Sequence, residues 1–344
     1  MGEFELIRRY FDRHRELAAE ASPVALGIGD DCALLLPRPG TQLAISTDML
    51  VEGRHFFADV DPEALGHKAL AVNLSDLAAM GAQPLAFTLA LALPAAEPGW
   101  LEGFARGLFQ LADVHQCRLI GGDTTRGPLN ICITVFGEVP VEGGQSLALR
   151  RSGAQAGDDL YVSGDLGEAR LALLALQGQL SLPAAQLQAA RLRLERPTPR
   201  IALGLALRGI ASAAIDLSDG LAGDLRHLAN SSNFGLCLNL ELIKNNLYPK
   251  LIAYNSINLR TISEIYSDIN SKNIYNMILT GGDDYELAFT AAPQRRGAVQ
   301  QAAIACGTRV SRIGQIETQT GLRITDASGQ AMALTAASFD HFAA

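Results

Sequence analysis

Aspartate residues recur along this chain directly beside short apolar runs. Asp30 and Asp31 interrupt one such run, and burying two neighbouring carboxylates without a partner is costly, so a cation must sit beside them. Most of the other acids follow an apolar run and precede a glycine, which predicts acids at strand ends. If those ends converge, they form a many-carboxylate pocket suited to hard divalent cations. The stretches are 27–32, 45–48, 73–76, 120–123, 215–220 and 280–284.

Each of these acids also has an ordinary explanation. A single Asp beside Gly is usually a turn residue, because Asp caps helices and fits turns. Six separate sites, several with an adjacent Ser or Thr, favour metal binding over six coincidental turns. Oxygen ligands of this kind select Mg²⁺ or Mn²⁺ over zinc, and the sequence offers no Cys/His cluster. Magnesium held by a few carboxylates and completed by phosphate oxygens is the usual arrangement in nucleotide chemistry.

Glycine-rich stretches that could bind phosphate are the next feature. The chain has no G-x-x-x-x-G-K-[ST] motif, which excludes a P-loop, and Gly27-x-Gly29 runs into two acids where a dinucleotide fingerprint needs small residues. The stretch 121–127 fits better, because its glycines let backbone N–H groups approach an anion while Asp123 holds metal. A tight turn explains the same stretch equally well. Arg151 could hold phosphate or be a solvated linker charge.

Residues for covalent catalysis are sparse. His55 follows the stretch that carries Asp48 and could contact a substrate, although a single histidine in a loop is more often incidental. No Ser/His/Asp or Cys/His pairing stands out, so covalent catalysis has no support in the sequence.

Length, charge and cysteine content limit the class of protein. A chain of 344 residues exceeds what one hydrophobic core usually serves, so two domains are expected. A formal charge of -8 argues against nucleic acid as a partner, although bound metal can still reverse the local sign for a phosphorylated small molecule. Five cysteines without a C-x-x-C are most simply buried thiols in a reducing compartment. The N-terminus does not resemble a signal peptide, and the longest apolar stretch, 85–93, is about half of a membrane span, so we expect a cytoplasmic protein without a membrane partner.

Strands that alternate with helices predict a mixed α/β fold. On the helix predicted over 62–80, Val72, Asp76 and Ala79 share a face, so Asp76 points inward or into a cleft. A Gly- and Arg-rich connector places the domain boundary near residue 150, which gives domains over 1–149 and 150–344. In the first half we expect helices over 3–20, 62–80 and 100–115 and strands near 24–28, 42–46, 85–93, 118–120 and 130–139. In the second half we expect strands over 159–163, 212–215, 285–290 and 309–317 and a helix over 221–229.

The segment 233–278 differs in composition from its surroundings. It holds nine Asn and eight Ile against one Ala, and three of the four lysines of the chain. Its polar content suits surface exposure, and Leu259, Ile262, Ile265 and Ile269 give partial amphipathic patterning. We therefore predict a peripheral excursion of the second domain that supplies no metal ligand.

Five stretches, taken in order, carry a resemblance to a known family. They are Gly27-Ile28-Gly29-Asp30-Asp31-Cys32-Ala33, Ser46-Thr47-Asp48, the segment 68–81 with its Asn-Leu-Ser-Asp, Gly121-Gly122-Asp123-Thr124-Thr125, and Asp216-Leu217-Ser218-Asp219-Gly220-Leu221. Together they resemble the thiamine-monophosphate kinases, within the wider group that includes aminoimidazole ribonucleotide synthetase and selenophosphate synthetase. The stretch 121–127 and the later Asp-Tyr-Glu-Leu point to the thiamine branch. The match runs from about residue 3 to 339–342 and lapses over 233–278.

The resemblance implies a fold and an activity. It implies a homodimer in which the N-terminal α/β domains pair through their sheets, with ATP near that interface and a C-terminal α/β domain that completes the substrate site. It implies ATP-dependent phosphorylation of thiamine monophosphate to thiamine diphosphate with several Mg²⁺ ions. Because the acceptor is an anionic phosphate oxygen, no general base is required and we name no catalytic residue; a carboxylate-rich site fits direct in-line transfer.

The resemblance also implies roles for individual residues. Asp31, Ser46, Thr47, Asp48, Asp76, Asp123, Asp216 and Asp219 would hold metal. Gly122, Asp123, Arg151 and Ser218 would contact ATP. His55, Asp283 and Phe339 would contact the substrate, although the family usually has Glu at the position of Asp283 and often Tyr or Trp at that of Phe339.

Two other functions stay open at this point. One is an ATP-dependent synthetase on the same scaffold, similar to aminoimidazole ribonucleotide synthetase, which makes a carbon–nitrogen bond and releases phosphate. The other is a cation-binding protein without enzymatic activity, for which the glycine-rich stretches have no purpose.

Overall fold

A computed structural model describes residues 2–13, 23–253, 277–326 and 328–332. The chain divides into two compact units, unit 1 over residues 1–148 and unit 2 over residues 149–344. Each unit contains a mixed sheet with helices, which confirms the predicted α/β class. None of the described helices combines the length and the apolar character that crossing a membrane requires.

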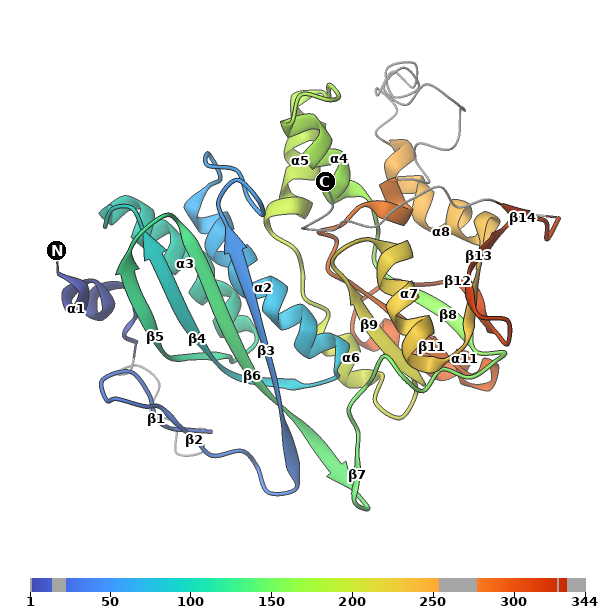
Figure 1. Ribbon diagram of the computed structural model, residues 1–344, viewed down its shortest axis with the longest axis horizontal. Coiled ribbons are helices and arrows are strands. Elements are labelled where there is room, and N and C mark those ends of the chain that lie inside the picture. Colours follow the sequence, from blue (N-terminus) through green and yellow to red (C-terminus); the bar gives the residue numbers. More distant parts are fainter. Residues whose placement is uncertain (1, 14–22, 254–276, 327, 333–344) are drawn as a thin grey trace. The chain divides into compact units, whose positions relative to one another are not determined.

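Unit 1 is a sheet covered on one face by two long helices (Figure 1). The strand order is β3-β6-β4-β5, with β7 paired to β6. The neighbours β4 and β5 are parallel and joined by α3, whereas the other pairs are antiparallel. The elements are α1 (Glu3–Leu6), the π-helix η1 (Ile7–Phe11), β1 (Val24–Leu26), β2 (Leu34–Leu35), β3 (Thr41–Val51), α2 (Pro62–Ala79), β4 (Gln83–Leu93), α3 (Pro98–Val114), β5 (Arg118–Arg126), β6 (Asn130–Glu142) and β7 (Gln145–Ser146).

Helix α2 is the buried helix on which the unit is built. It begins at a regular cap, because the Asp61 carboxylate accepts the N–H of Ala64 at 3.0 Å and Pro62 occupies the first turn. It packs closely against α3, where a Cβ atom on Gly107 would lie 1.8 Å from the Glu63 carbonyl oxygen. Most of α2 is therefore buried, and its inward polar side chains need partners within the protein.

Strand β3 is the end strand of this sheet, and its side chains alternate between two faces. The face that carries Ser46 and Asp48 lies toward α2: the Ser46 hydroxyl bonds to Asp76, and the Asp48 N–H bonds to Asn73. On the opposite face Leu43, Ile45 and Met49 are 45%, 59% and 55% exposed. The open face of the sheet therefore carries a row of apolar side chains at this edge.

Unit 2 is a seven-stranded sheet of order β14-β13-β10-β12-β8-β11-β9 (Figure 1). The neighbours β10 and β13 are parallel and the remaining pairs are antiparallel. Helices α4, α5, α7 and α8 contribute apolar residues to one continuous core with this sheet. The elements are β8 (Asp159–Ser163), α4 (Glu168–Leu176), α5 (Ala184–Glu195), α6 (Ile201–Ala206), β9 (Ala213–Leu217), α7 (Leu221–Ser232), β10 (Gly235–Asn239), α8 (Leu240–Ala253), β11 (Glu286–Ala291), the 3₁₀-helix η3 (Pro293–Arg295), α11 (Arg296–Ala305), β12 (Val310–Glu317), β13 (Gly321–Thr325) and β14 (Ala331–Met332).

The prediction of a peripheral excursion over 233–278 is wrong for its first part. Strand β10 lies between β13 and β12 inside the sheet, and Leu236 and Leu238 are fully buried. Helix α8 follows directly, and Ile243 and Leu247 are also fully buried in the core of the unit. The physical reason is the period: apolar residues alternate in β10 and recur four residues apart in α8. Residues 254–276, including the predicted amphipathic pattern, lie outside the described residues.

Two stretches predicted to end their strands are strand throughout. Strand β3 continues past Thr47 and Asp48 to Val51, and β5 continues through 121–126. Both have long partners: β3 pairs with β6 along its whole length, and β5 pairs with β4 as far as Arg126. Pairing with neighbours therefore outweighs the low strand propensity of Gly and Asp, and these acids lie within strands instead of beyond them.

Two smaller predictions also need correction. The helix predicted over 3–20 ends at Phe11 in its described part, because Asp12 is extended with φ −85° and ψ 101°; residues 14–22 lie outside the described part. The five cysteines are free thiols, but Cys117 alone among them is buried and Cys32 is exposed.

Candidate functional site

In unit 1, Ser46, Asp48 and Asp76 lie together where β3 meets α2. The Ser46 hydroxyl hydrogen-bonds the Asp76 carboxylate. The Asp48 N–H donates to the side-chain oxygen of Asn73 at 3.1 Å, one turn before Asp76 on the same helix. Asp48 and Asp76 are both half-buried, so neither is sealed from solvent. The structure thus joins Ser46 and Asp76, two of the eight predicted metal ligands, by their side chains, and ties the backbone of a third, Asp48, to the same helix.

Thr47 is separated from these residues by the alternation of the strand. Its hydroxyl lies 2.8 Å from that of Thr134 on β6, on the open face of the sheet. Ser46 and Asp48 face α2 instead. The structure therefore does not place the Thr47 side chain beside its two predicted neighbours.

Gly122 and Asp123 lie on β5, opposite Leu89 and Ala90 of β4. Gly122 has φ +145°, and a Cβ atom there would lie 1.8 Å from the Leu89 carbonyl oxygen, so only glycine fits this close pairing. Asp123, the next residue along β5, is exposed. Of the glycines predicted to bind an anion, Gly122 lets β5 lie close to β4, just before an exposed acid, whereas a Cβ atom on Gly121 would meet no neighbour.

His55 and Asp31 lie in the turns of unit 1. The Nδ1 atom of His55 accepts the N–H of Val51 at 2.9 Å, which leaves the proton of a neutral ring on Nε2. The buried ammonium of Lys68 donates to the His55 carbonyl at 3.3 Å and ties this turn to α2. Asp31 is exposed between β1 and β2, and its N–H donates to the Asp30 carboxylate at 2.9 Å.

In unit 2, β9 and β11 are antiparallel neighbours, and the end of β9 lies beside the start of β11, which brings Ser218 and Asp283 together. The N–H of Asp283 donates to the Ser218 carbonyl, and the N–H of Tyr285 to the Leu217 carbonyl, each at 2.9 Å. Asp283 and Tyr285 have φ +67° and +49°, a region that residues other than glycine rarely adopt. Such conformations persist only where the surroundings hold them, and they concentrate at functional sites. Asp216 lies two residues before Ser218, within β9, and is buried.

Asp224 organises the loop that carries Ser218 and Asp219. Its carboxylate accepts the N–H of Asp219 at 3.1 Å and is further stabilised by the backbone N–H groups of Ser218 and Gly220. The side chain is buried in the first turn of α7, where the helix dipole favours negative charge. Burial and the nearby charge of Asp219 nevertheless raise the pKa of Asp224 to about 7.

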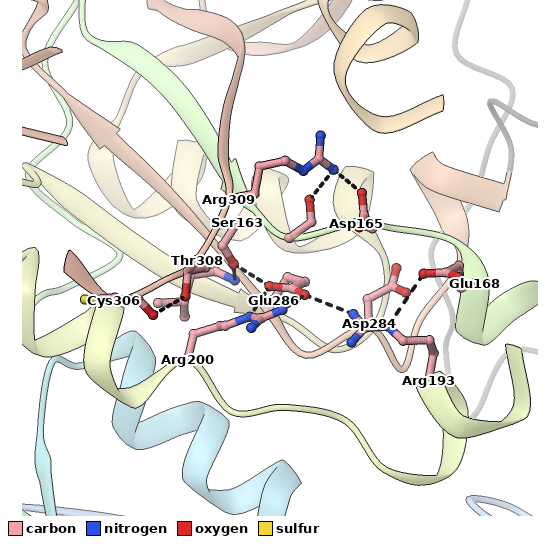
Figure 2. A network of polar contacts seen from close by, with 12 residues as sticks. Ser163, Asp165, Glu168, Arg193, Arg200, Asp284, Glu286, Cys306, Thr308 and Arg309 are labelled. Carbon is pink, nitrogen blue, oxygen red and sulfur yellow. Dashed lines mark hydrogen bonds and ion pairs between the residues drawn. The ribbon is translucent and has the colours of Figure 1, made fainter. Parts of the chain in front are cut away.

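A buried polar network lies around Glu286 and Asp284, which follow Asp283 in the chain (Figure 2). Glu286 lies at its centre and accepts two hydrogen bonds from Arg200, at 2.5 and 2.6 Å, and one from Arg193 at 3.0 Å. The Ser163 hydroxyl donates to the same carboxylate at 2.6 Å. A second acid, Glu168, lies 3.7 Å from Arg193. Two carboxylates thus face two guanidinium groups across four elements of the unit.

Asp284 adds a third acid to this network. Both its oxygens accept the N–H of Gly167, at 3.0 and 3.1 Å, just before α4 begins. Complete burial raises the pKa of Asp284 well above its usual range. The bonds to the N–H of Gly167 therefore anchor the loop of Asp284 to the start of α4.

Two predicted site residues, Arg151 and Phe339, remain. Arg151 is exposed in the connector, and its carbonyl accepts the Ser232 hydroxyl at 3.0 Å. Phe339 lies outside the described residues. Within the parts of the chain that the structure covers, no three His, Cys, Asp or Glu side chains are grouped so as to hold a metal ion. The predicted pocket of many carboxylates, which draws on both units, therefore stays a prediction.

Sequence reasoning did not single out three of these residues. Asn73 lies in the quoted Asn-Leu-Ser-Asp stretch, but only its Asp was assigned a role. Asp224 follows Asp219 by five residues in the first turn of a predicted helix, a position where a carboxylate can reach back to loop N–H groups. Asp284 is adjacent to Asp283, and its burial could not be read from the sequence.

Comparisons with known proteins show two matching domains and relatives of nearly full length. Residues 29–139 match the N-terminal domain of AIR synthase related protein and residues 155–327 match its C-terminal domain. The thiamine-monophosphate kinase of Escherichia coli (strain K12) is 43% identical over 349 residues, which covers 99% of this chain and 98% of the relative. A crystal structure of thiamine-monophosphate kinase from Stenotrophomonas maltophilia K279a superposes with a TM-score of 0.77 at 44% identity and covers 91% of this chain and 93% of its own. A third relative, AaThiL complexed with AMPPCP and TMP, is 29% identical with a TM-score of 0.73 and 89% of each chain covered.

The two domain matches define the class, a two-domain protein of the AIR synthase related type. Membership of this class does not by itself define the family, so the family is assigned from the identity over nearly the full length of the chain. The chain belongs to the thiamine-monophosphate kinase family.

Proposed function

We propose that this protein transfers the terminal phosphoryl group of ATP to thiamine monophosphate and forms thiamine diphosphate and ADP. The observation that carries the proposal is 43% identity along nearly the whole chain to a thiamine-monophosphate kinase. In unit 1 the Ser46 hydroxyl is bonded to the Asp76 carboxylate, and the backbone of Asp48 is tied to the same helix. A relative complexed with AMPPCP and TMP supports the same pair of substrates.

The reaction needs little covalent chemistry from the protein. A phosphate oxygen of thiamine monophosphate attacks the terminal phosphorus of ATP, the new P–O bond forms, and the bond to the bridging oxygen breaks so that ADP leaves with the electron pair. The attacking oxygen is already anionic, so no side chain has to remove a proton. The protein must bring two polyanions together and hold them in line, which is a task of binding and orientation.

Mg²⁺ is the cation that the residues present would fit. Asp48, Asp76 and Ser46 offer hard oxygen donors on one side of unit 1. Mg²⁺ is usually held by one or two carboxylates and completed by substrate phosphates, so a protein site with three clustered acids is not required. When bound, the ion neutralises phosphate charge during the transfer. The full set that we propose for several ions is Asp31, Ser46, Thr47, Asp48, Asp76, Asp123, Asp216 and Asp219.

The substrate contacts follow the family. We propose that Gly122, Asp123, Arg151 and Ser218 contact ATP, and that His55, Asp283 and Phe339 contact thiamine monophosphate. In this assignment unit 1 supplies His55, Gly122 and Asp123, and unit 2 supplies Arg151, Ser218, Asp283 and Phe339. For His55, the bond from Val51 to Nδ1 supports Nε2–H as the group that donates to a ligand.

We also propose a homodimer formed through the sheet of unit 1. The exposed row of Leu43, Ile45 and Met49 supports this, because a monomer gains stability when such an apolar face is covered. The cytoplasm is the proposed location, with neither nucleic acid nor membrane as a partner.

An assay that couples ADP release to a colour change tests the function. With ATP, Mg²⁺ and thiamine monophosphate we expect ADP and thiamine diphosphate in equal amounts and no free phosphate. Free phosphate that appears only with a formylglycinamidine-type nucleotide would indicate the synthetase alternative. The absence of ADP above background with thiamine monophosphate would reject the proposed activity.

A further inference from the structure

Asn73 is a buried polar residue on α2 to which the proposed reaction gives no role. Its side chain is 1% exposed, so both ends of its amide must find partners within the protein. Its Nδ2 donates to the carbonyl of Ala69, four residues earlier on α2, at 3.0 Å. Its Oδ1 accepts the backbone N–H of Asp48 at 3.1 Å.

The two bonds of Asn73 fix its orientation. A rotated amide would set NH₂ against the Asp48 N–H and oxygen against the Ala69 carbonyl, so both bonds would be lost at once. The Asp48 N–H also has a special position, because among the strands that the structure describes β3 pairs with β6 alone and stands at the end of the sheet. Asn73 supplies the acceptor that a further strand would otherwise supply.

The consequence for Asp48 and Asp76 is a fixed register between strand and helix. Asn73 and Asp76 are three residues apart on α2 and therefore lie on the same side of the helix. Ser46 and Asp48 are two residues apart on β3 and lie on the same face of the strand. The contacts Asn73–Asp48 and Asp76–Ser46 are thus two adjacent ties between the same two elements.

We infer that Asn73 is a positioning residue that sets the distance between the Asp48 and Asp76 carboxylates and thereby the affinity of unit 1 for a divalent cation. This inference rests on the proposed function for the identity of the two acids as cation ligands. Asn73 itself touches neither cation nor substrate. It acts through the backbone of Asp48, as groups outside the ligand sphere do in other metal sites.

The test compares Mn²⁺ binding to the wild-type protein and to Asn73→Ala. Free Mn²⁺ is measured by electron paramagnetic resonance during a titration without ATP or thiamine monophosphate, so the result does not depend on the proposed activity. Loss of an outer partner typically costs about 10- to 100-fold in metal affinity, and we expect a rise in the Mn²⁺ dissociation constant of about tenfold or more. In the kinase assay the Mg²⁺ concentration for half-activation should rise by a similar factor, while kcat at saturating Mg²⁺ changes by less than about threefold.

Asn246→Ala is the matched control. Asn246 lies on α8 in unit 2 and makes the same kind of bond, from Nδ2 to the carbonyl of Leu242 four residues earlier, at 2.8 Å. Its replacement should leave Mn²⁺ affinity unchanged. If Asn73→Ala does not fold, the smaller change Asn73→Ser is used, with circular dichroism to establish the folded state.

The outcomes separate the two levels of the proposal. Equal Mn²⁺ affinity in folded Asn73 variants and wild type, or no Mn²⁺ bound by the wild type, would overturn the positioning role. Weakened Mn²⁺ binding together with no phosphorylation of thiamine monophosphate by the wild type would uphold the positioning role and reject the proposed function.

Discussion

The backbone N–H of Asp219 donates a hydrogen bond of 3.1 Å to the buried carboxylate of Asp224, five residues further along the chain. This bond folds the loop that carries Ser218 and Asp219 back over the first turn of α7. The neighbouring ends of β9 and β11 are then joined by the bond from Asp283 to Ser218. Asp224 therefore fixes the loop of Ser218 and Asp219, and the bond from Asp283 to the Ser218 carbonyl joins the proposed substrate residue to that loop.

Replacement of Asp224 by Asn should loosen this loop. One carboxylate oxygen becomes an NH₂ group that faces backbone N–H donors, and each buried donor left unpaired costs about 1–3 kcal/mol. Because 1.4 kcal/mol corresponds to about a tenfold change, we expect kcat/KM for ATP to fall by about tenfold or more. Steady-state kinetics with varied ATP measure this change.

The control for Asp224→Asn is Asp326→Asn. Asp326 also accepts backbone N–H bonds within a turn of unit 2, from Ser328 and Gln330, both at 2.9 Å. Its replacement should not alter ATP kinetics. Equal kinetics for the Asp224 and Asp326 variants would show that the hydrogen bonds of Asp224 do not affect the use of ATP.

Asp48→Asn should reduce turnover by about two orders of magnitude or more while the protein still folds, because a lost ligand charge weakens metal-assisted stabilisation of the transition state. The backbone bond to Asn73 does not involve the replaced oxygen, so the position of the strand should persist. Turnover at saturating Mg²⁺ is the measurement, with Asp59→Asn, an exposed acid of the same unit, as the control. Nearly normal turnover would mean that Asp48 holds no metal.

Ile45→Glu should weaken the proposed dimer. Ile45 is 59% exposed on the open face of β3, and burying an unpaired carboxylate there costs several kcal/mol. We expect the dimer dissociation constant to rise by about 30-fold or more, as measured by light scattering after size-exclusion chromatography across a concentration series. Leu192→Glu, at a position on α5 that is 54% exposed, is the matched control. A dimer of unchanged affinity would place the interface elsewhere.

The stability contribution of Asp159 should be lost in acid. Asp159 is fully buried; burial acts to raise its pKa, but hydrogen bonds from Arg296 at 2.6 and 2.8 Å and from Arg312 at 3.1 Å outweigh this and hold the pKa below its usual value. Because the pKa of Asp159 is lower in the folded state than in the unfolded chain, its carboxylate stabilises the protein at pH values above the unfolded pKa of about 4. This stabilisation is lost as the pH falls through the folded-state pKa.

Urea unfolding of wild type and Asp159→Asn between pH 7 and pH 3 measures this contribution. The variant should be less stable at pH 7, and the difference in unfolding free energy should shrink as the pH falls below about 4. A difference that stays constant over this range would show that the ion pairs of Asp159 do not contribute through its charge.

The sequence allowed the class of fold to be predicted, and candidate acids to be proposed, for a physical reason. Helix α3 shows an amphipathic pattern, α2 is marked by the proline in its first turn, and β8, β9 and β11 are short apolar runs. An acid beside an apolar run is visible as a break in that run. The pairing of β3 with β6 and of β5 with β4 was not visible, because it joins segments far apart in the chain. Only the structure therefore shows that the Ser46 and Thr47 side chains lie on opposite faces of β3.

Long-range hydrogen bonds explain the other residues that the sequence did not indicate. The role of Asn73 depends on an N–H in a strand 25 residues earlier, and that of Asp284 on the N–H of Gly167, 117 residues earlier. In the segment 233–278 composition was misleading. Its Asn and Lys content suggested a surface excursion, whereas the alternation of apolar residues in β10 placed that strand within the sheet.

The burial of α8 gives the last prediction. Leu247 is fully buried in the core of unit 2, and its truncation to Ala should lower the unfolding free energy by about 2–5 kcal/mol, through lost apolar contact and the cavity that remains. Lys244→Ala, at an exposed position three residues earlier on the same helix, should change stability by less than about 0.5 kcal/mol. Urea unfolding followed by far-ultraviolet circular dichroism compares the two. If α8 were peripheral, both variants would unfold at the same urea concentration, and replacement of residues 245–258 by a flexible linker would leave a stable protein. We expect the opposite, because that replacement removes Leu247 from the core.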